Sequence, residues 1–192
     1  KSIDGFHPNR KDEFLLGRVC AAKAYEMCKG SELLNLEPNK DRSPAWPSDV
    51  VGTISHNLHW VGSAVANKED LLGVGIDFEV RGRTRIKLSE QIRSPQDLVK
   101  HPKFSDEELL TLIFSCKESL YKALHPKVKI FFGFEDAAVR EIRGNNDFEP
   151  GSFVIDLLSP LNQSFGPGTR YSFHGKFVQD ENSLLTVIEV PN

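Results

Sequence analysis

Two short segments of the chain carry charged side chains at spacings that could do chemistry. Residues 73–80 read GVGIDFEV, and residues 114–124 read FSCKESLYKAL. In a β-strand, side chains two positions apart point to the same face, so Asp77 and Glu79 are expected to project together. Paired carboxylates repel unless a cation lies between them, and hard oxygen ligands favour magnesium, calcium or manganese. By itself such a pair is more often a solvated strand face, so it needs support from elsewhere in the chain.

The second segment is expected to form an amphipathic helix. Its buried stripe follows three- and four-residue spacing and consists of Leu109, Ile113, Cys116, Leu120 and Leu124. Glu118 and Lys122 fall on the opposite side, where this order also describes a routine surface ion pair worth about 0.2–0.5 kcal/mol. Lys117 projects at the edge of the stripe, so helical spacing alone does not bring all three charged residues together.

Capping and breaking signals predict the helices that position these segments. Asn9 is a suitable N-cap for a first helix that runs towards Gly30. Ser105 and Glu108 form an S-x-x-E capping box, which predicts that a second helix starts there. That helix is expected to stop before Pro126.

Strand-like runs account for much of the remaining chain. Residues 50–56, 60–66 and 71–80 are expected to form an antiparallel meander. Further strands are expected at residues 129–134, 152–157, 170–178 and 184–190, and a short helix around residues 96–100. The order of helix then strands occurs twice, which indicates a duplicated architecture.

Composition bounds the class of protein. With 192 residues, 39% hydrophobic and 27% charged, the chain can bury the core of one sizeable domain or two small ones. A net charge of −3 argues against a broad field that would attract nucleic acid or a membrane surface. We expect no membrane-spanning run and no signal-peptide core, and Cys20, Cys28 and Cys116 suit reduced thiols in a cytoplasmic protein.

A third candidate motif ends the first predicted strand. Ser55 and His56 follow Thr53-Ile54 and could donate hydrogen bonds to a phosphate. An equally good interpretation is that His56 caps a turn. The residues alone leave these two interpretations open.

The three motifs in this order resemble the 4'-phosphopantetheinyl transferases of the surfactin-synthetase and enterobactin-synthetase component D type. The residues that carry the resemblance are TISH at 53–56, VGIDFE at 74–79 and FSCKESLYKA at 114–123. HPNRKDEFLLGR at 7–18, RSPAWP at 42–47 and FFGFEDAAV at 131–139 are similar to the component D branch. The likeness covers most of the chain, and Phe78, Cys116 and Thr53 depart from the usual family residues without removing a charged position.

The resemblance implies a reaction and a set of roles. The expected activity is magnesium-dependent (or manganese-dependent) transfer of 4'-phosphopantetheine from coenzyme A to a serine of an acyl or peptidyl carrier protein, releasing adenosine 3',5'-bisphosphate. It implies that Asp77, Glu79 and Glu118 hold the metal, and that Lys117 and Lys122 neutralise the transferring phosphoryl group. Either Glu118 or a metal-bound hydroxide would take the serine proton.

The resemblance also implies where coenzyme A binds. Arg10 and Arg18, two helical turns apart, would meet its 3'-phosphate or diphosphate, Arg42 would lie near the nucleotide, and Ser55 with His56 would bind phosphate. Asp77, Lys117, Glu118 and Lys122 would also line this cofactor site.

The implied fold is α+β, a monomer of two similar α/β halves, each a helix packed on a mostly antiparallel sheet. Residues 1–79 would hold the coenzyme A-binding helix, residues 80–192 the catalytic helix, and the cofactor would lie in the cleft between them. Arg81, Arg83 and Arg85 would steer an acidic carrier protein.

Two other functions remain compatible with these residues. A magnesium-dependent phosphodiesterase would also use acids and lysines around a metal, although the acidic chain lacks the broad basic stripe that a nucleic-acid substrate needs. A coenzyme A or carrier-binding module without catalysis would use the carboxylates for structure only.

Overall fold

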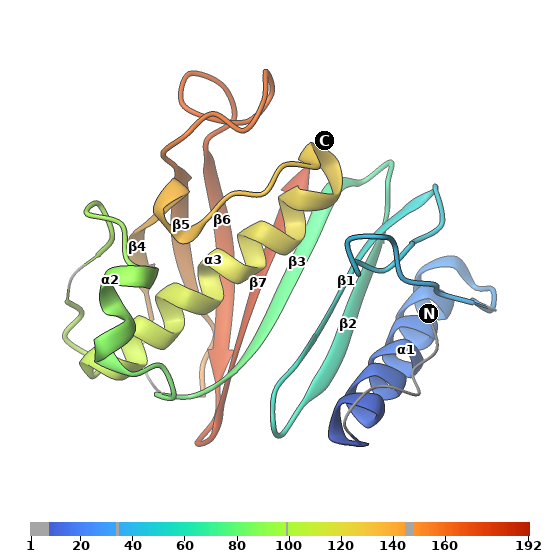
Figure 1. The fold of residues 1–192 in the computed structure, drawn as a ribbon, viewed down its shortest axis with the longest axis horizontal. Helices are drawn as coiled ribbons and strands as arrows, with labels where there is room; N and C mark the ends of the chain where they lie inside the picture. The colour runs from blue at the N-terminus through green and yellow to red at the C-terminus, as the bar shows by residue number, and fades with distance from the viewer. Residues whose placement is uncertain (1–7, 34, 99, 145–147) are drawn as a thin grey trace.

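Two antiparallel sheets, each covered by one long helix, form the protein (Figure 1). The computed structural model describes residues 8–33, 35–98, 100–144 and 148–192. The smaller sheet pairs β1 (Val50–His56) with β2 (Val61–Asn67), and α1 (Pro8–Lys29) packs on these two strands. The expected α+β fold is confirmed.

The larger sheet has five strands in the order β3-β7-β6-β5-β4, and α3 (Asp106–Val128) lies across it (Figure 1). Its strands are β3 (Leu71–Val80), β4 (Ala137–Arg143), β5 (Gly151–Leu157), β6 (Ser172–Gln179) and β7 (Ser183–Pro191). Short helical turns connect the elements: η2 (Ile86–Leu88), α2 (Ser89–Ile92) and η3 (Phe134–Asp136). Within the described residues, no helix combines the length and apolar character that a bilayer-spanning segment requires.

The core helix α3 forms as its sequence predicts. The Ser105 hydroxyl accepts from the Glu108 amide, and the Glu108 carboxylate accepts from the Ser105 amide, so both halves of the capping box are present. All five residues of the predicted stripe are buried against the five-stranded sheet. Burial of this face is the main source of the helix's stability, because isolated helices are marginal in water.

Several predicted boundaries were wrong. The first helix begins at Pro8, so Asn9 lies inside its first turn instead of capping it. The second helix continues past Pro126 to Val128, because a proline in the last turn removes only one late hydrogen bond and Lys129 ends the helix in the left-handed conformation. Residues 129–134 form no strand, and the short helix lies at residues 86–92, before the predicted segment.

The expected meander of three strands was also wrong. β3 leaves β2 and pairs with β7, so it becomes the edge of the five-stranded sheet. Its outward amides are satisfied by β1 side chains: Thr53 Oγ1 accepts from Ile76 N at 3.4 Å, and Ser55 Oγ accepts from Phe78 N at 3.0 Å. Hydroxyl groups therefore replace a backbone ladder where the two sheets meet. The predicted division at residue 79 stays a prediction.

Glycines of the GVGIDFEV segment allow α3 to approach β3 closely. A methyl group on Gly75 would overlap the carbonyl oxygen of Ser119, and one on Gly73 would overlap that of Ala123. Both glycines alternate with Asp77 along the strand, so they share the face that Asp77 turns to the helix. Close packing at the glycines is what brings the helix within reach of this carboxylate.

Replacing Gly75 by alanine is expected to lower the free energy of unfolding by about 1–3 kcal/mol, because backbone cannot move aside as a flexible side chain does. Urea denaturation would measure the change. Gly17→Ala in α1 is the matched control, because its new methyl group would meet only the Ile54 side chain and alanine favours a helix. An unfolding midpoint for Gly75→Ala equal to that of the control would contradict the close approach.

Candidate active site at the junction of the sheets

Three of the predicted site residues meet directly where the sheets join. Lys122 Nζ donates to Asp77 Oδ1 at 2.6 Å and to Ser55 Oγ at 3.0 Å. The Ser55 hydroxyl also donates to Asp77 Oδ1 at 3.2 Å. β1, β3 and α3 each contribute one member, so the three sequence motifs converge on one point.

The Asp77 carboxylate is buried but only half satisfied. Only 4% of the residue is exposed, and Oδ1 accepts hydrogen bonds from both Lys122 and Ser55. Its second oxygen, Oδ2, is buried without a hydrogen-bond partner among the described residues. A buried, unpaired carboxylate oxygen is costly, so this atom is a suitable ligand for a cation.

Two further carboxyl groups share the electrostatic field of Asp77. Burial, followed by the negative charge of Asp77, raises the pKa of Glu79 to about 7. Burial also raises the pKa of Glu118, which the nearby Lys122 ammonium opposes and Asp77 reinforces. Both groups therefore hold protons more tightly than free glutamate, which is typical of acids that are arranged to bind a cation or to accept a proton.

The carboxylates do not form a finished metal centre. Among the described residues, no group of three or more His, Cys, Asp or Glu side chains is arranged to hold an ion. The surface ion pair considered for Glu118 and Lys122 is also missing from the described ion pairs, because Lys122 turns to Asp77 instead. The donor set nevertheless fits a hard divalent cation, since it offers carboxylate oxygens that repel one another and one that lacks a partner.

A cleft of about 320 Å³ opens beside this cluster between the two sheets. Arg42 and Trp46 line it from the loop before β1, and Tyr121 and Lys122 line it from α3. Arg42 has a left-handed backbone, at φ 70°, and is exposed. Arg42 and Lys122 bring positive charge to the lining, which suits an anionic ligand, and the acidic Asp41 lies beside Arg42.

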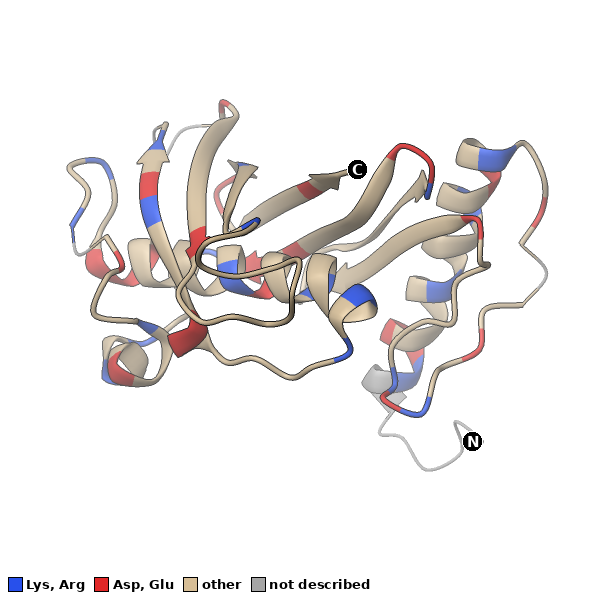
Figure 2. Ribbon diagram, turned by 90° about the horizontal axis from the view of Figure 1, so that it is seen from above, with Lys and Arg blue, Asp and Glu red and all other residues tan. Residues whose placement is uncertain are grey.

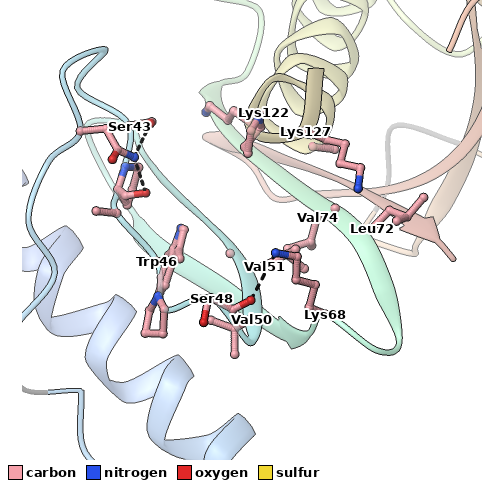
Figure 3. Close-up of a pocket in the computed structure, with 18 of the residues that line it drawn as sticks. Ser43, Trp46, Ser48, Val50, Val51, Lys68, Leu72, Val74, Lys122 and Lys127 are labelled. Carbon is pink, nitrogen blue, oxygen red and sulfur yellow. Dashed lines mark hydrogen bonds between the residues drawn. The ribbon is translucent and has the colours of Figure 1, made fainter. Parts of the chain in front are cut away.

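A second cleft, drawn in Figure 3, shares Trp46 and Lys122 with the first. Figure 3 shows Lys68 donating to the Ser48 carbonyl on one side, while Lys127 lies at the end of α3 on the other. The Trp46 ring packs against Gly52, where any side chain would overlap it. This contact fixes the loop before β1 as a wall of both clefts.

An apolar pocket of about 350 Å³ lies on the other flank of α3. Its lining includes Glu118, Tyr121, Phe131 and Phe134. Phe131 is 80% exposed, and its ring packs edge-on against Tyr121 with 5.9 Å between centroids. The pocket therefore offers an aromatic surface directly beside a candidate proton acceptor.

Lys117 does not join this cluster. Only 3% of it is exposed, and its three donors go to Asp97 Oδ2 at 2.6 Å, the Phe134 carbonyl at 2.8 Å and the Ile92 carbonyl at 2.9 Å. Burial lowers the pKa of Lys117, and the hydrogen bond to Asp97 opposes that shift. All three donors of Lys117 therefore have protein acceptors in this arrangement. Its expected role at a phosphoryl group stays a prediction.

Arg18 and His56 make no described contact with the Asp77 cluster. Arg18 lines a groove between α1 and residues 33 and 35–38, with its guanidinium carbon 4.5 Å from the Phe14 ring centroid. His56 is exposed at the end of β1, with Nδ1 3.8 Å from the Glu13 carboxylate. The Arg10 side chain lies outside the described residues. Their assignments to coenzyme A stay predictions.

Sequence reasoning missed Asp97, the buried partner of Lys117. Its carboxylate accepts from the Ser94 amide at 2.6 Å and from the Val139 amide at 2.6 Å, as well as from Lys117. Ser94 and Asp97 have the S-x-x-D spacing of a capping motif, which was the available signal. The partner 20 residues further along the chain could not be read from that spacing.

Two family models match the chain on either side of the junction. The 4'-phosphopantetheinyl transferase N-terminal domain matches residues 2–66, and the 4'-phosphopantetheinyl transferase superfamily matches residues 73–153. The 4'-phosphopantetheinyl transferase Svp of Streptomyces mobaraensis is 30% identical over 194 residues, covering 95% of this chain and 73% of Svp. The chain belongs to the 4'-phosphopantetheinyl transferase superfamily.

Other members of the superfamily are similarly related. The 4'-phosphopantetheinyl transferase Npt of Nocardia iowensis is 30% identical over 183 residues, which cover 93% of this chain and 82% of Npt. Enterobactin synthase component D of Salmonella austin is 31% identical over 180 residues, which cover 93% of this chain and 71% of that protein. The resemblance stated from the sequence motifs is confirmed.

The raised pKa of Glu79 predicts how the stability of this transferase depends on pH. A carboxyl whose pKa is higher in the folded state stabilises the fold while protonated, and that contribution is lost as the pH rises through about 7. In the presence of a chelator, Glu79→Gln is expected to match wild type near pH 5. Above pH 8 it should exceed wild type by about 1–3 kcal/mol in the free energy of unfolding.

Urea denaturation from pH 5 to 8.5 measures this difference. Glu189→Gln, an exposed position on β7, is the control for the loss of a carboxyl group. A Glu79→Gln variant whose stability follows the wild-type pH dependence throughout the range would show that Glu79 titrates like a solvated side chain.

Proposed function

We propose that the junction cluster is the active site of a transferase that moves 4'-phosphopantetheine from coenzyme A to a serine of an acyl or peptidyl carrier protein. Membership of the superfamily supports the reaction. The observation that carries the site assignment is the contact of Lys122 with Asp77 and Ser55, which joins both parts of the family match at one point. In the proposal, Lys122 is the cation beside the phosphoryl group, and Lys117 is left out of that role.

The two flanks of α3 suit the two chemically different ends of coenzyme A. We assign the nucleotide and diphosphate to the cleft lined by Arg42 and Lys122, because these two residues bring positive charge to it. The uncharged pantetheine arm is assigned to the pocket of Tyr121 and Phe131 beside Glu118. The proposed phosphate ligands from the N-terminal half of the chain remain Arg10, Arg18 and His56.

Asp77, Glu79 and Glu118 are the residues that would hold a magnesium ion. The partnerless Asp77 oxygen and the mutual repulsion of the carboxyl groups support this assignment. Bound there, magnesium would neutralise part of the negative charge on the diphosphate, which is the main requirement of phosphoryl transfer. Cation binding should also lower the pKa of Glu79, because the positive charge favours the ionised carboxylate.

Glu118 is the proposed proton acceptor. The carrier serine oxygen forms a bond to the phosphorus that bears the pantetheine arm, and the bond from that phosphorus to adenosine 3',5'-bisphosphate breaks. The serine proton passes to the Glu118 carboxylate. A carboxyl whose pKa is raised by burial accepts a proton more readily than a solvated one, which suits Glu118 to this role near neutral pH.

Intact-mass spectrometry of an apo carrier protein tests the reaction. Incubation with coenzyme A and magnesium should add one phosphopantetheine group, and a chelator should abolish the gain. Glu118→Gln is expected to lower kcat by about 10²–10⁴-fold. Glu107→Gln, an exposed position on the same helix, is the control and should leave kcat unchanged.

Two other results would support the alternative functions. Coenzyme A binding with no mass gain on any of several acyl and peptidyl carriers would favour a binding module. Release of adenosine 3',5'-bisphosphate from coenzyme A without carrier modification would favour a phosphodiesterase.

An exposed basic run next to the cluster is the proposed carrier-docking surface. Arg83, Arg85 and Lys87 follow β3 with no acidic residue among them, although Figure 2 shows acidic and basic positions interspersed along α1 and α3. Arg81 is excluded from the surface, because its guanidinium pairs with Glu108 at 2.6 Å. Carrier proteins are usually acidic, so the local positive charge is complementary to them.

Charge reversal at Arg83 and Arg85 together is expected to raise the KM for the carrier by roughly tenfold at low salt, and by less at high salt. The affinity for coenzyme A, measured by calorimetry, should stay unchanged. Reversal of Lys176, exposed on β6, controls for the change in net charge. Carrier kinetics like those of wild type at low salt would exclude this surface.

A further inference from the structure

A buried ion pair ties α3 to two segments that flank Glu118. The Lys117 ammonium and the Asp97 carboxylate are 2.6 Å apart, and both side chains are almost fully buried. Lys117 also donates to the carbonyl that ends α2, at Ile92, and to the carbonyl that begins η3, at Phe134. The next residue of α3 is Glu118, so these contacts act one position from the proposed proton acceptor.

Both oxygens of the Asp97 carboxylate accept hydrogen bonds. Oδ2 accepts from Lys117 and from the Ser94 amide and hydroxyl, while Oδ1 accepts from the Val139 amide of β4 at 2.6 Å. The backbone supports the same attachment, because the Leu98 amide donates to the Val139 carbonyl at 2.8 Å. One carboxylate therefore links the segment after α2, the middle of α3 and the start of β4.

A purely structural role would not require charge at this position. A buried ion pair loses the hydration of both ions, and apolar residues of similar size often give equal or greater stability. What apolar residues could not do is bind the carbonyls of Ile92 and Phe134, which Lys117 holds with fixed directions. Phe134 belongs to the wall of the aromatic pocket beside Glu118, so the pair determines where that wall stands.

We propose that Asp97, acting through Lys117, is a positioning residue that holds the Phe134 wall of the aromatic pocket against the part of α3 that carries Glu118. The role in catalysis rests on the proposed transferase function. In this view, Lys117 contributes by its buried contacts and touches no phosphate. The pair orients the pocket and Glu118 relative to each other, as a supporting group does for residues that contact a substrate.

The test compares Asp97→Asn with Asp156→Asn, which makes the same change at a weaker ion pair, 3.8 Å from Arg140, on β5. Asp97→Asn should lower kcat at least about tenfold, because an ångström-scale misplacement at the reacting groups is enough for such a loss. Its dissociation constant for adenosine 3',5'-bisphosphate should stay within about threefold of wild type. The reason is that Asp97 is not among the described residues that line the proposed nucleotide cleft. The control should retain both values.

Amide hydrogen exchange supplies a readout that does not depend on activity. Asp97→Asn should speed exchange in residues 92–98 and 134–139, while exchange in β1 and β2 stays as in wild type. A double variant, Asp97→Leu with Lys117→Met, guards against simple misfolding because it leaves no unpaired buried charge. Its unfolding midpoint should exceed that of Asp97→Asn, while its kcat remains at least about tenfold below wild type because the carbonyl contacts are missing.

The outcomes separate this proposal from the proposed function. Wild-type kcat in the folded double variant, or wild-type exchange in Asp97→Asn, would overturn the positioning role. Loss of bisphosphate binding in parallel with kcat would also overturn it, because that result indicates general unfolding. If the wild-type protein modifies no carrier, the proposed function fails, and the exchange experiment alone decides whether Asp97 holds the pocket wall.

Discussion

The close approach of α3 to β3 is the constraint on which the candidate site depends. Gly73 and Gly75 present only backbone to the helix, so the helix carbonyls at Ser119 and Ala123 come into contact with the strand. The Ser115 hydroxyl lies 3.5 Å from the Asp77 carbonyl, in line with these contacts. Helix and strand therefore run in opposite directions in register, and that register carries Lys122 to the Asp77 carboxylate.

The junction between the sheets uses the same residues for structure and for the site. β3 is an edge strand whose outward amides would otherwise lack partners, and hydroxyl groups of Thr53 and Ser55 satisfy them. Ser55 also contacts Asp77 and Lys122, so the group that joins the sheets also orients the charged cluster. A site built in this way depends on both sheets, which explains why its residues are dispersed along the chain.

Two lysines five residues apart on α3 have different surroundings. Lys122 remains partly open to the cleft and pairs with a carboxylate that keeps one oxygen free of protein partners among the described residues. Lys117 points into the interior, where Asp97 and two carbonyls use all its donors. An ammonium that holds three fixed acceptors serves geometry, whereas one beside an open cleft remains available to an anion.

The sequence by itself determined the elements whose signals are local. The capping box at Ser105 and the apolar stripe predicted α3, because hydrogen bonds and burial within one helix depend on short spacings. Alternation along the strand predicted that Asp77 and Glu79 project together, and the charge of Asp77 does raise the pKa of Glu79. The ordered motifs also identified the family, since they retain the charged residues of all three segments.

The tertiary structure decided which of these residues meet. β3 pairs with β7, more than 100 residues away, whereas the local turn before β3 predicted a meander. Burial raised the pKa of Glu79 and Glu118, and long-range contacts sent Lys117 to Asp97 and Lys122 to Asp77. Spacing along a chain specifies the face of an element, but the partner across that face depends on how distant segments pack.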